Sequence, residues 1–318
     1  MASPTPTLYS INAGSARGTL DVKEVWSQDG DSPLPSGLKQ IVPITSGTTT
    51  YLIGFDGGGK GTALKTTNAA PFLTPVASNI DVGAADIINP FILGNSPWLL
   101  AYQAEKGVLS FFPVTSDLTA PKPPFTYSHK RVPLTANFTV CEPIVINDLL
   151  YVLMYSFKTG DVNIWSLNVT PYPQAGSPPG TPALNILPVW VHQWAKSWDR
   201  FAFFYMGGES FFFKINFGPK LNVNIDHILD DPSEGSVEVG TWMQNQLTDP
   251  TKIDIVEPFT MGAGEPYYVT YRNDGSTDWF RIHVDCQGWT KESSGSTVAS
   301  ATQVVPYQVG SDRFALFY

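Results

Sequence analysis

Short runs of large apolar residues, each ending on an aromatic residue, recur along the whole chain. Six such runs alternate with polar, often glycine-containing turns and end at Phe55, Tyr102, Tyr155, Tyr205, Tyr271 and Tyr318. In five of them a proline stands twelve or thirteen residues before the closing aromatic, at Pro43, Pro90, Pro143, Pro258 and Pro306. The closing aromatics are about fifty residues apart, which indicates an array of small, similar units.

We interpret each unit as a four-stranded antiparallel sheet and the whole chain as an all-β, six-bladed β-propeller. In the first complete unit the strands fall near 39–46, 49–56, 61–67 and 71–78. The second strand of each unit is almost continuously apolar, as expected for a strand covered on both faces by neighbouring blades. Because the repeats run from end to end, we expect residues 1–318 to form a single domain.

The chain begins in the middle of a repeat, and this predicts how the ring closes. Residues 7–12 and 19–26 have the pattern of two strands but lack partners in their own stretch of chain. The last repeat supplies only the inner half of a blade. We therefore expect one blade to combine about 302–318 with 5–27, so that sheet hydrogen bonds between the two chain ends hold the ring closed.

The fourth repeat is longer than the others. We start this repeat at Leu187, with its inner strand around His192 and its second strand in the run that ends at Tyr205. An insertion at 219–234 then accounts for the extra length, and a short helix fits near 225–230. The stretch 170–183, rich in Pro and Gly, is long enough to form a lid.

The composition restricts the partners and the compartment only in part. The chain has 28 acidic and 19 basic residues and a net charge of −9, whereas nucleic acid requires a basic face, so we expect no nucleic-acid partner. No apolar run approaches about eighteen residues, so we expect no membrane span. The amino terminus lacks a signal-peptide pattern, while Asn137 and Asn168 begin glycosylation sequons, so the compartment stays open.

The two cysteines, Cys141 and Cys286, lie in different repeats, so we expect two free thiols.

The layout resembles that of the fungal fucose-binding propeller lectins. The resemblance rests on the order of apolar–aromatic strand, polar turn, strand and Gly-Trp, clearest in Tyr267–Trp289 (YYVTYRNDGSTDWFRIHVDCQGW), and on a chain that opens in mid-blade. It implies a six-bladed propeller. In that family an Arg before the closing aromatic and a Glu on the next strand bind fucose. Here the Arg positions hold non-basic residues, Ile53, Leu100, Leu153, Phe203, Val269 and Leu316 or their neighbours. The resemblance therefore extends to the fold and not to the fucose site.

One ring of positions predicts a site at the central channel. The residue just before each repeated proline, or its equivalent, should lie at one height around the channel, namely Val42, Asn89, Glu142, His192, Glu257 and Val305. Four of the six are polar, whereas the turns differ from repeat to repeat, which favours one axial site over six equivalent rim sites. Glu142, His192 and Glu257 are the candidate catalytic residues. The alternative is that the two glutamates pair with cations or face water in the channel.

Other side chains could contact a ligand in the same place. Trp190 and Trp194 flank His192 and would form an aromatic wall, and Lys158 and Arg272 would lie around the channel mouth. The candidate substrate-binding residues are Trp190, Trp194, Asn89, Tyr102, Tyr155, Tyr205, Tyr271, Lys158 and Arg272. No pair of side chains has metal-ligand spacing, and no cofactor motif occurs, so we expect neither a metal nor a cofactor.

These observations leave more than one function open. In the first, the channel binds a small apolar or aromatic organic molecule, and catalysis is by positioning and a few hydrogen bonds, as in cyclisation or cycloaddition of a natural-product precursor. Such a protein is similar to the fungal propeller hetero-Diels–Alderases. In the second, the protein is a glycan-binding lectin with degenerate sites between blades, and a scaffold for protein interactions is a third reading. The number of ligands bound per chain separates the first two.

Overall fold

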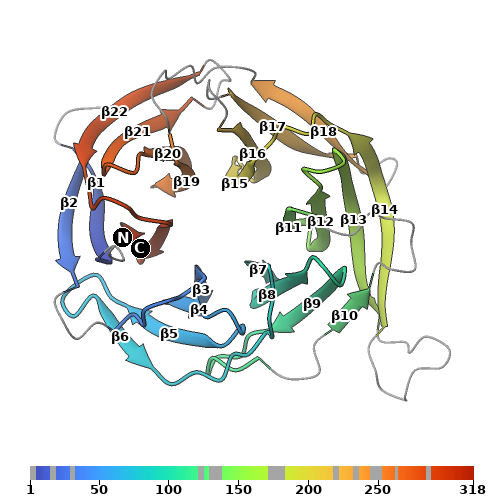
Figure 1. Ribbon diagram of the computed structural model, residues 1–318, viewed down its shortest axis with the longest axis horizontal. Helices are drawn as coiled ribbons and strands as arrows, with labels where there is room; N and C mark the ends of the chain where they lie inside the picture. Colours follow the sequence, from blue (N-terminus) through green and yellow to red (C-terminus); the bar gives the residue numbers. More distant parts are fainter. Residues whose placement is uncertain are drawn as a thin grey trace.

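The computed structural model is a ring of six four-stranded antiparallel sheets (Figure 1), which confirms the predicted six-bladed β-propeller. The residues it describes contain no helix, and so none long and apolar enough to cross a membrane. The structure describes residues 5–14, 19–28, 33–120, 125–128, 138–170, 183–217, 222–231, 236–243, 253–261, 264–283 and 288–318.

We number the blades along the chain and give their strands from the channel outward. Blade 1 is β3 (Gln40–Ser46), β4 (Thr49–Phe55), β5 (Gly61–Thr66) and β6 (Leu73–Val76). Blade 2 is β7 (Ile87–Leu93), β8 (Ser96–Gln103), β9 (Val108–Pro113) and β10 (Phe125–Ser128). Blade 3 is β11 (Val140–Ile146), β12 (Leu149–Tyr155), β13 (Asp161–Thr170) and β14 (Ala183–Gln193).

The other three blades follow in the same order from channel to rim. Blade 4 is β15 (Arg200–Met206), β16 (Glu209–Asn216), β17 (Asn222–Asp231) and β18 (Ser236–Met243). Blade 5 is β19 (Ile255–Met261), β20 (Glu265–Tyr271), β21 (Ser276–Ile282) and β22 (Trp289–Ser296). Blade 6 is β23 (Val304–Val309), β24 (Asp312–Phe317), β1 (Thr7–Ala13) and β2 (Leu20–Ser27).

Both ends of the chain lie in blade 6, as the sequence predicts. β1 pairs with β24 in antiparallel register from Thr7 opposite Phe317 to Ile11 opposite Arg313, and β2 then forms the rim. Leu8 is buried in the cluster that blade 6 shares with blade 1, and Ile11 in the cluster that it shares with blade 5. The ring is therefore closed by main-chain hydrogen bonds between segments from opposite ends of the chain.

Four of the closing aromatics, Tyr102, Tyr155, Tyr271 and Tyr318, add a hydrogen bond from their hydroxyl to the next blade. Each of the four tyrosine hydroxyls bonds to the backbone of the segment that leads into the next inner strand. The nearest pairs are Tyr102 Oη with Phe138 N at 3.3 Å, Tyr155 Oη with Ala195 O at 2.6 Å, Tyr271 Oη with Ala301 N at 2.7 Å and Tyr318 Oη with Pro35 O at 3.0 Å. The remaining two junctions, after blades 1 and 4, have Phe55 and Ile215 in this place, which have no hydroxyl.

Blade 4 corrects the sequence-based register. Residues 187–193 belong to β14, the rim strand of blade 3, and the inner strand of blade 4 is β15. The second strand of this blade is thus β16, and residues 225–230, expected to be helical, lie in the strand β17. The misreading has a physical cause. Inner and rim strands both have one unpaired edge, so both tolerate proline, and Pro188 imitates the repeated proline of an inner strand.

Some predictions fall outside the described residues. They are the greater part of the expected lid, at 171–182, the sequon at Asn137, and Cys286. The Cys141 thiol is free and buried in the interface between blades 2 and 3, where burial raises its pKa well above the ordinary value.

Candidate functional site

The central channel contains a cavity of about 500 Å³ that is lined from the six inner strands. These strands surround the centre of the ring in Figure 1. The lining residues come from the beginning of each inner strand and extend to the repeated prolines. Its polar members are Lys39, Gln40, Asp86, Asn89, Glu142, Arg200, Glu257, Thr302 and Gln303. The cavity is therefore more polar than the aromatic pocket that the sequence predicts.

Glu257 is held by a cation from the neighbouring blade. Arg200, the first residue of β15, donates from Nη2 to Glu257 Oε2 on β19. Burial raises the pKa of the Glu257 carboxyl, and the positive charge of Arg200 opposes that rise. The ion pair therefore favours the charged form of Glu257.

Glu142 has a neutral partner instead. Asn89 Nδ2 donates to Glu142 Oε2 at 2.7 Å and to the Cys141 carbonyl oxygen at 2.8 Å, which joins the inner strands of blades 2 and 3. Burial raises the pKa of Glu142 to about 8, and the negative charge of Glu257 contributes to the rise. Glu142 thus keeps its proton to a higher pH than an ordinary carboxyl group, whereas Glu257 has a guanidinium beside it that favours its charged form.

This difference predicts how stability depends on pH. The folded pKa of Glu142 exceeds its ordinary value of 4.5, so its contribution to stability is fully present below pH 4.5 and is lost as the pH rises towards 8. Glu142→Gln should remove that loss and stabilise the protein by about 2 kcal/mol at pH 8 relative to pH 5, since partial exposure reduces the full effect of the pKa shift. Urea unfolding at both pH values measures the change. Glu105→Gln, at an exposed position, is the control, and equal pH dependence of wild type and Glu142→Gln would contradict the assignment.

Three predicted residues come together in the cavity, whereas the predicted histidine and the two predicted tryptophans lie elsewhere. Asn89, Glu142 and Glu257 line it. His192 lies exposed on the rim strand β14, where Trp190 stacks on it with ring centroids 5.2 Å apart. Trp194 packs between blades against Lys214, whose Nζ lies 4.1 Å from the centre of the indole ring. The place assigned to His192 is taken by Ala202, so His192, Trp190 and Trp194 are wrong as channel residues.

The predicted tyrosines also have other positions. Tyr102, Tyr155 and Tyr271 are buried between blades and use their hydroxyls for the junction hydrogen bonds described above, so a ligand in the channel does not reach them. Tyr205 lies on β15 beyond the lining residues, and 48% of it is exposed. Burial raises the pKa of Tyr205, and the charge of Glu142 adds to this effect.

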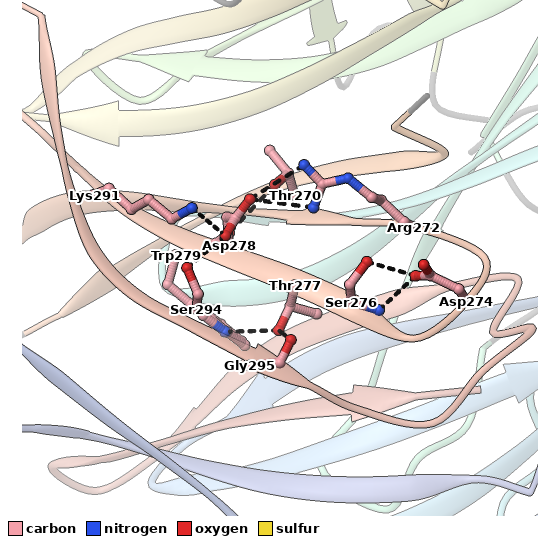
Figure 2. Close-up of polar contacts among 10 residues, drawn as sticks. All are labelled: Thr270, Arg272, Asp274, Ser276, Thr277, Asp278, Trp279, Lys291, Ser294 and Gly295. Atoms are coloured by element: carbon pink, nitrogen blue, oxygen red, sulfur yellow. Dashed lines mark hydrogen bonds and ion pairs between the residues drawn. The ribbon is translucent and has the colours of Figure 1, made fainter. Parts of the chain in front are cut away.

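The predicted cations do not surround a ligand. Lys158 is exposed in the turn after β12. Arg272 belongs to an ion-pair network within blade 5 (Figure 2), where its Nη1 and Nη2 lie 3.1 and 3.2 Å from Asp278 Oδ2. Lys291 and Ser294 donate to Asp278 Oδ1 at 2.5 and 2.7 Å. Burial raises the pKa of Asp278, but these donors outweigh it and hold the pKa below the ordinary value. Arg272 is therefore a structural residue of the blade.

Sequence reasoning missed Arg200 and two amides of the cavity. Arg200 was missed because it lies in the blade whose register was misread. The amide of Gln40 forms hydrogen bonds with both the N–H and the carbonyl oxygen of Ile88, and Gln303 does the same with Ile41 N and Lys39 O, at 2.9 and 3.0 Å. These glutamines join neighbouring inner strands. The sequence held one signal for Gln40. It is a polar residue that stands two positions before the ring position Val42, at the start of the apolar stretch Ile41–Ile44.

The comparisons with known proteins support the fold alone. No family pattern matches the chain, and no curated protein matches its sequence. Among solved structures, BBS1N in complex with ARL6DN has a TM-score of 0.51 and 9% identity, with 90% of this chain and 94% of that chain covered. An exo-β-1,3-galactanase from Phanerochaete chrysosporium has a TM-score of 0.47 and 11% identity, with 84% and 67% covered. At such identities these likenesses carry no information about a ligand.

Proposed function

We propose that the channel cavity binds one small organic molecule and that Glu142 and Glu257 act on it as general acid and general base. The observation that carries the proposal is that two carboxyl groups with different partners face one cavity. Asn89 is a neutral partner for Glu142, whereas Arg200 favours the charged form of Glu257. Acid–base catalysis at neutral pH usually requires two titratable groups whose surroundings give them different pKa values, so that one holds a proton and the other accepts one.

The reaction class that we propose is a cofactor-independent cyclisation of a natural-product precursor, including cycloaddition of the hetero-Diels–Alder type. The protonated Glu142 would donate a hydrogen bond or proton to a carbonyl oxygen. The Glu257 carboxylate would accept a proton from the attacking hydroxyl, so that the proton count is unchanged when the ring closes. The lining has nine polar residues and only two aromatic ones, Phe201 and Phe203. We therefore propose a ligand with several oxygen atoms rather than a purely apolar one.

Variants of the two glutamates test this proposal. Wild-type protein is incubated with a panel of hydroxy-ketones and hydroxy-enones, and chromatography with mass spectrometry detects products of unchanged mass. Glu142→Gln and Glu257→Gln should each lower the rate by about a hundredfold, the usual size of a general acid–base contribution. His192→Ala, on the rim, is the matched control and should have the wild-type rate. Full activity in both glutamine variants would contradict the assignment of the site.

The second candidate is glycan binding, and the polar lining of the channel cavity favours it. Amide, carboxylate and guanidinium groups match the hydroxyl groups of a sugar. In the form first considered, the sugar sites lie between blades and several are filled per chain. The ring positions differ between blades, from Val42 to Glu142, which favours a single site. Calorimetric titration with monosaccharides distinguishes one sugar site in the channel from several sites between blades. Saturation with several sugars per chain would contradict the single site and favour the lectin with sites between blades.

A further inference from the structure

Arg313 is a buried cation in the cleft between blades 5 and 6. It lies on β24, is 7% exposed, and is near the end of the channel opposite to the carboxyl pair. Its Nε donates to the Thr260 carbonyl oxygen at 2.7 Å, and its Nη1 donates to the Ser311 carbonyl oxygen at 3.1 Å. A guanidinium has five N–H donors, so three remain without a partner among the described residues.

Arg313 also lacks a carboxylate partner among the described residues. The nearest acidic side chain in sequence, Asp312, points to the other face of the sheet, because successive strand residues alternate, and it accepts a hydrogen bond from Asn68 at 2.9 Å. Burial lowers the pKa of Arg313 by more than the charge of Asp312 raises it, so the guanidinium lacks a counter-charge in direct contact. A bound anion would supply the missing charge.

The repeat shows that the propeller does not require a cation at this position. Arg313 pairs with Gln308, two residues after the repeated proline. The equivalent positions in the other five blades hold small or apolar residues, Thr50, Pro97, Leu150, Ser210 and Pro266. Five blades are therefore built without a charge here, which argues that Arg313 has a role other than packing, at one site per chain.

A cavity lies directly against Arg313. Its volume is about 180 Å³, and Phe259, Pro306 and Gln308 are among its lining residues. At about 30 Å³ per water molecule in the liquid, this is room for roughly six waters or one molecule of the size of benzoate. Phe259 and Pro306 supply apolar surface, and the lining contains no acidic residue. The cavity thus combines one buried cation with a wall that is apolar in part, on the side of Phe259 and Pro306.

We propose that Arg313 anchors a second binding site, in the cleft between blades 5 and 6, for a small organic carboxylate with a flat apolar body. The planar guanidinium matches a carboxylate in a two-point hydrogen bond, which is stronger than a bond between neutral groups. The ring of the ligand would contact Phe259 and Pro306. This site adjoins the channel cavity, with which it shares Pro258 and Pro306, but it contains neither carboxyl group and does not depend on the function proposed for the channel.

Titration of the full chain with acetate, benzoate and phenylacetate tests the site, with neutral benzamide as the comparison. Calorimetry should show one benzoate per chain, saturating at millimolar concentration or below, and a rise in melting temperature that benzamide does not cause. Arg313→Gln should weaken benzoate binding by about ten- to a hundredfold, as expected for loss of a hydrogen bond to a charged group. Arg313→Lys keeps the charge but not the planar fork, and should weaken binding to a lesser degree.

A control variant makes the outcome decisive. Lys65→Gln removes an exposed cation on blade 1 and should bind benzoate as the wild type does. If Arg313→Gln fails to fold, the comparison of Arg313→Lys with Lys65→Gln still measures the role of the guanidinium. The proposal is overturned if none of the three carboxylates binds at 10 mM, or if the Arg313 variants bind benzoate as tightly as the wild type.

Discussion

A chain that lacks residues 1–27 will not unfold cooperatively. Deletion of β1 and β2 removes the partner of β24 along the five residue pairs from Thr7–Phe317 to Ile11–Arg313. It also uncovers apolar side chains that Leu8 and Tyr9 bury. Each such side chain contributes about 1.5–3 kcal/mol when buried, so the loss over two strands is comparable to the usual total stability of a domain. Calorimetry should show a broad transition without the sharp peak of the full chain.

A chain that begins at Thr5 is the control, since it keeps both strands and should melt as the full chain does. The deleted chain is also expected to associate, because β24 would present an unpaired apolar edge. Size-exclusion chromatography measures this association. A monomeric deletion variant with a sharp melting transition would show that the ring does not need its closing strands.

Replacing Lys214 with Met will lower the free energy of unfolding by about 3–5 kcal/mol. Lys214 Nζ lies 2.6 Å from Asp226 Oδ2, and the two side chains are only 6% and 2% exposed. The same ammonium group lies over the rings of Trp194 and Trp198, at 4.1 and 5.1 Å from their centres. Removal of the lysine leaves the Asp226 carboxylate buried without this cation. Urea unfolding of the two proteins at pH 7 measures the difference.

The double variant Lys214→Met, Asp226→Leu distinguishes the cost of an isolated charge from the value of the pair. Replacement of both partners by apolar residues of similar volume is often close to neutral, so the double variant should recover most of the lost stability. Two results would count against this account. One is a loss of less than 1 kcal/mol in the single variant, and the other is a double variant as unstable as the sum of both single changes.

The architecture could be predicted from the sequence because buried second strands repeat. A strand such as β12, Leu149–Tyr155, is covered on both faces, so its apolar run and closing tyrosine are required in every blade that repeats this packing. The unpaired strands at the amino terminus then determined how the ring closes. These inferences depend on burial, which leaves a strong pattern in the sequence.

The site could be predicted only where the register was certain. Asn89, Glu142 and Glu257 were found because each precedes a repeated proline, and the proline fixes its height in the channel. Blade 4 has Phe203 in place of that proline, so Arg200 could not be placed, and the rim residue His192 was put in the channel instead. The partner of a channel residue comes from another blade, and its distance along the chain carries no signal of the contact.

The tyrosine hydrogen bonds between blades have a consequence for the motion of the ring. Two junctions lack them, between blades 1 and 2 and between blades 4 and 5, and in a six-membered ring these junctions face each other across the channel. Side chains that line the channel form bonds across both, from Gln40 to Ile88 and from Arg200 to Glu257. These junctions separate two half-rings of three blades, so we expect any relative motion of the halves to occur along them, where a molecule in the channel would contact both.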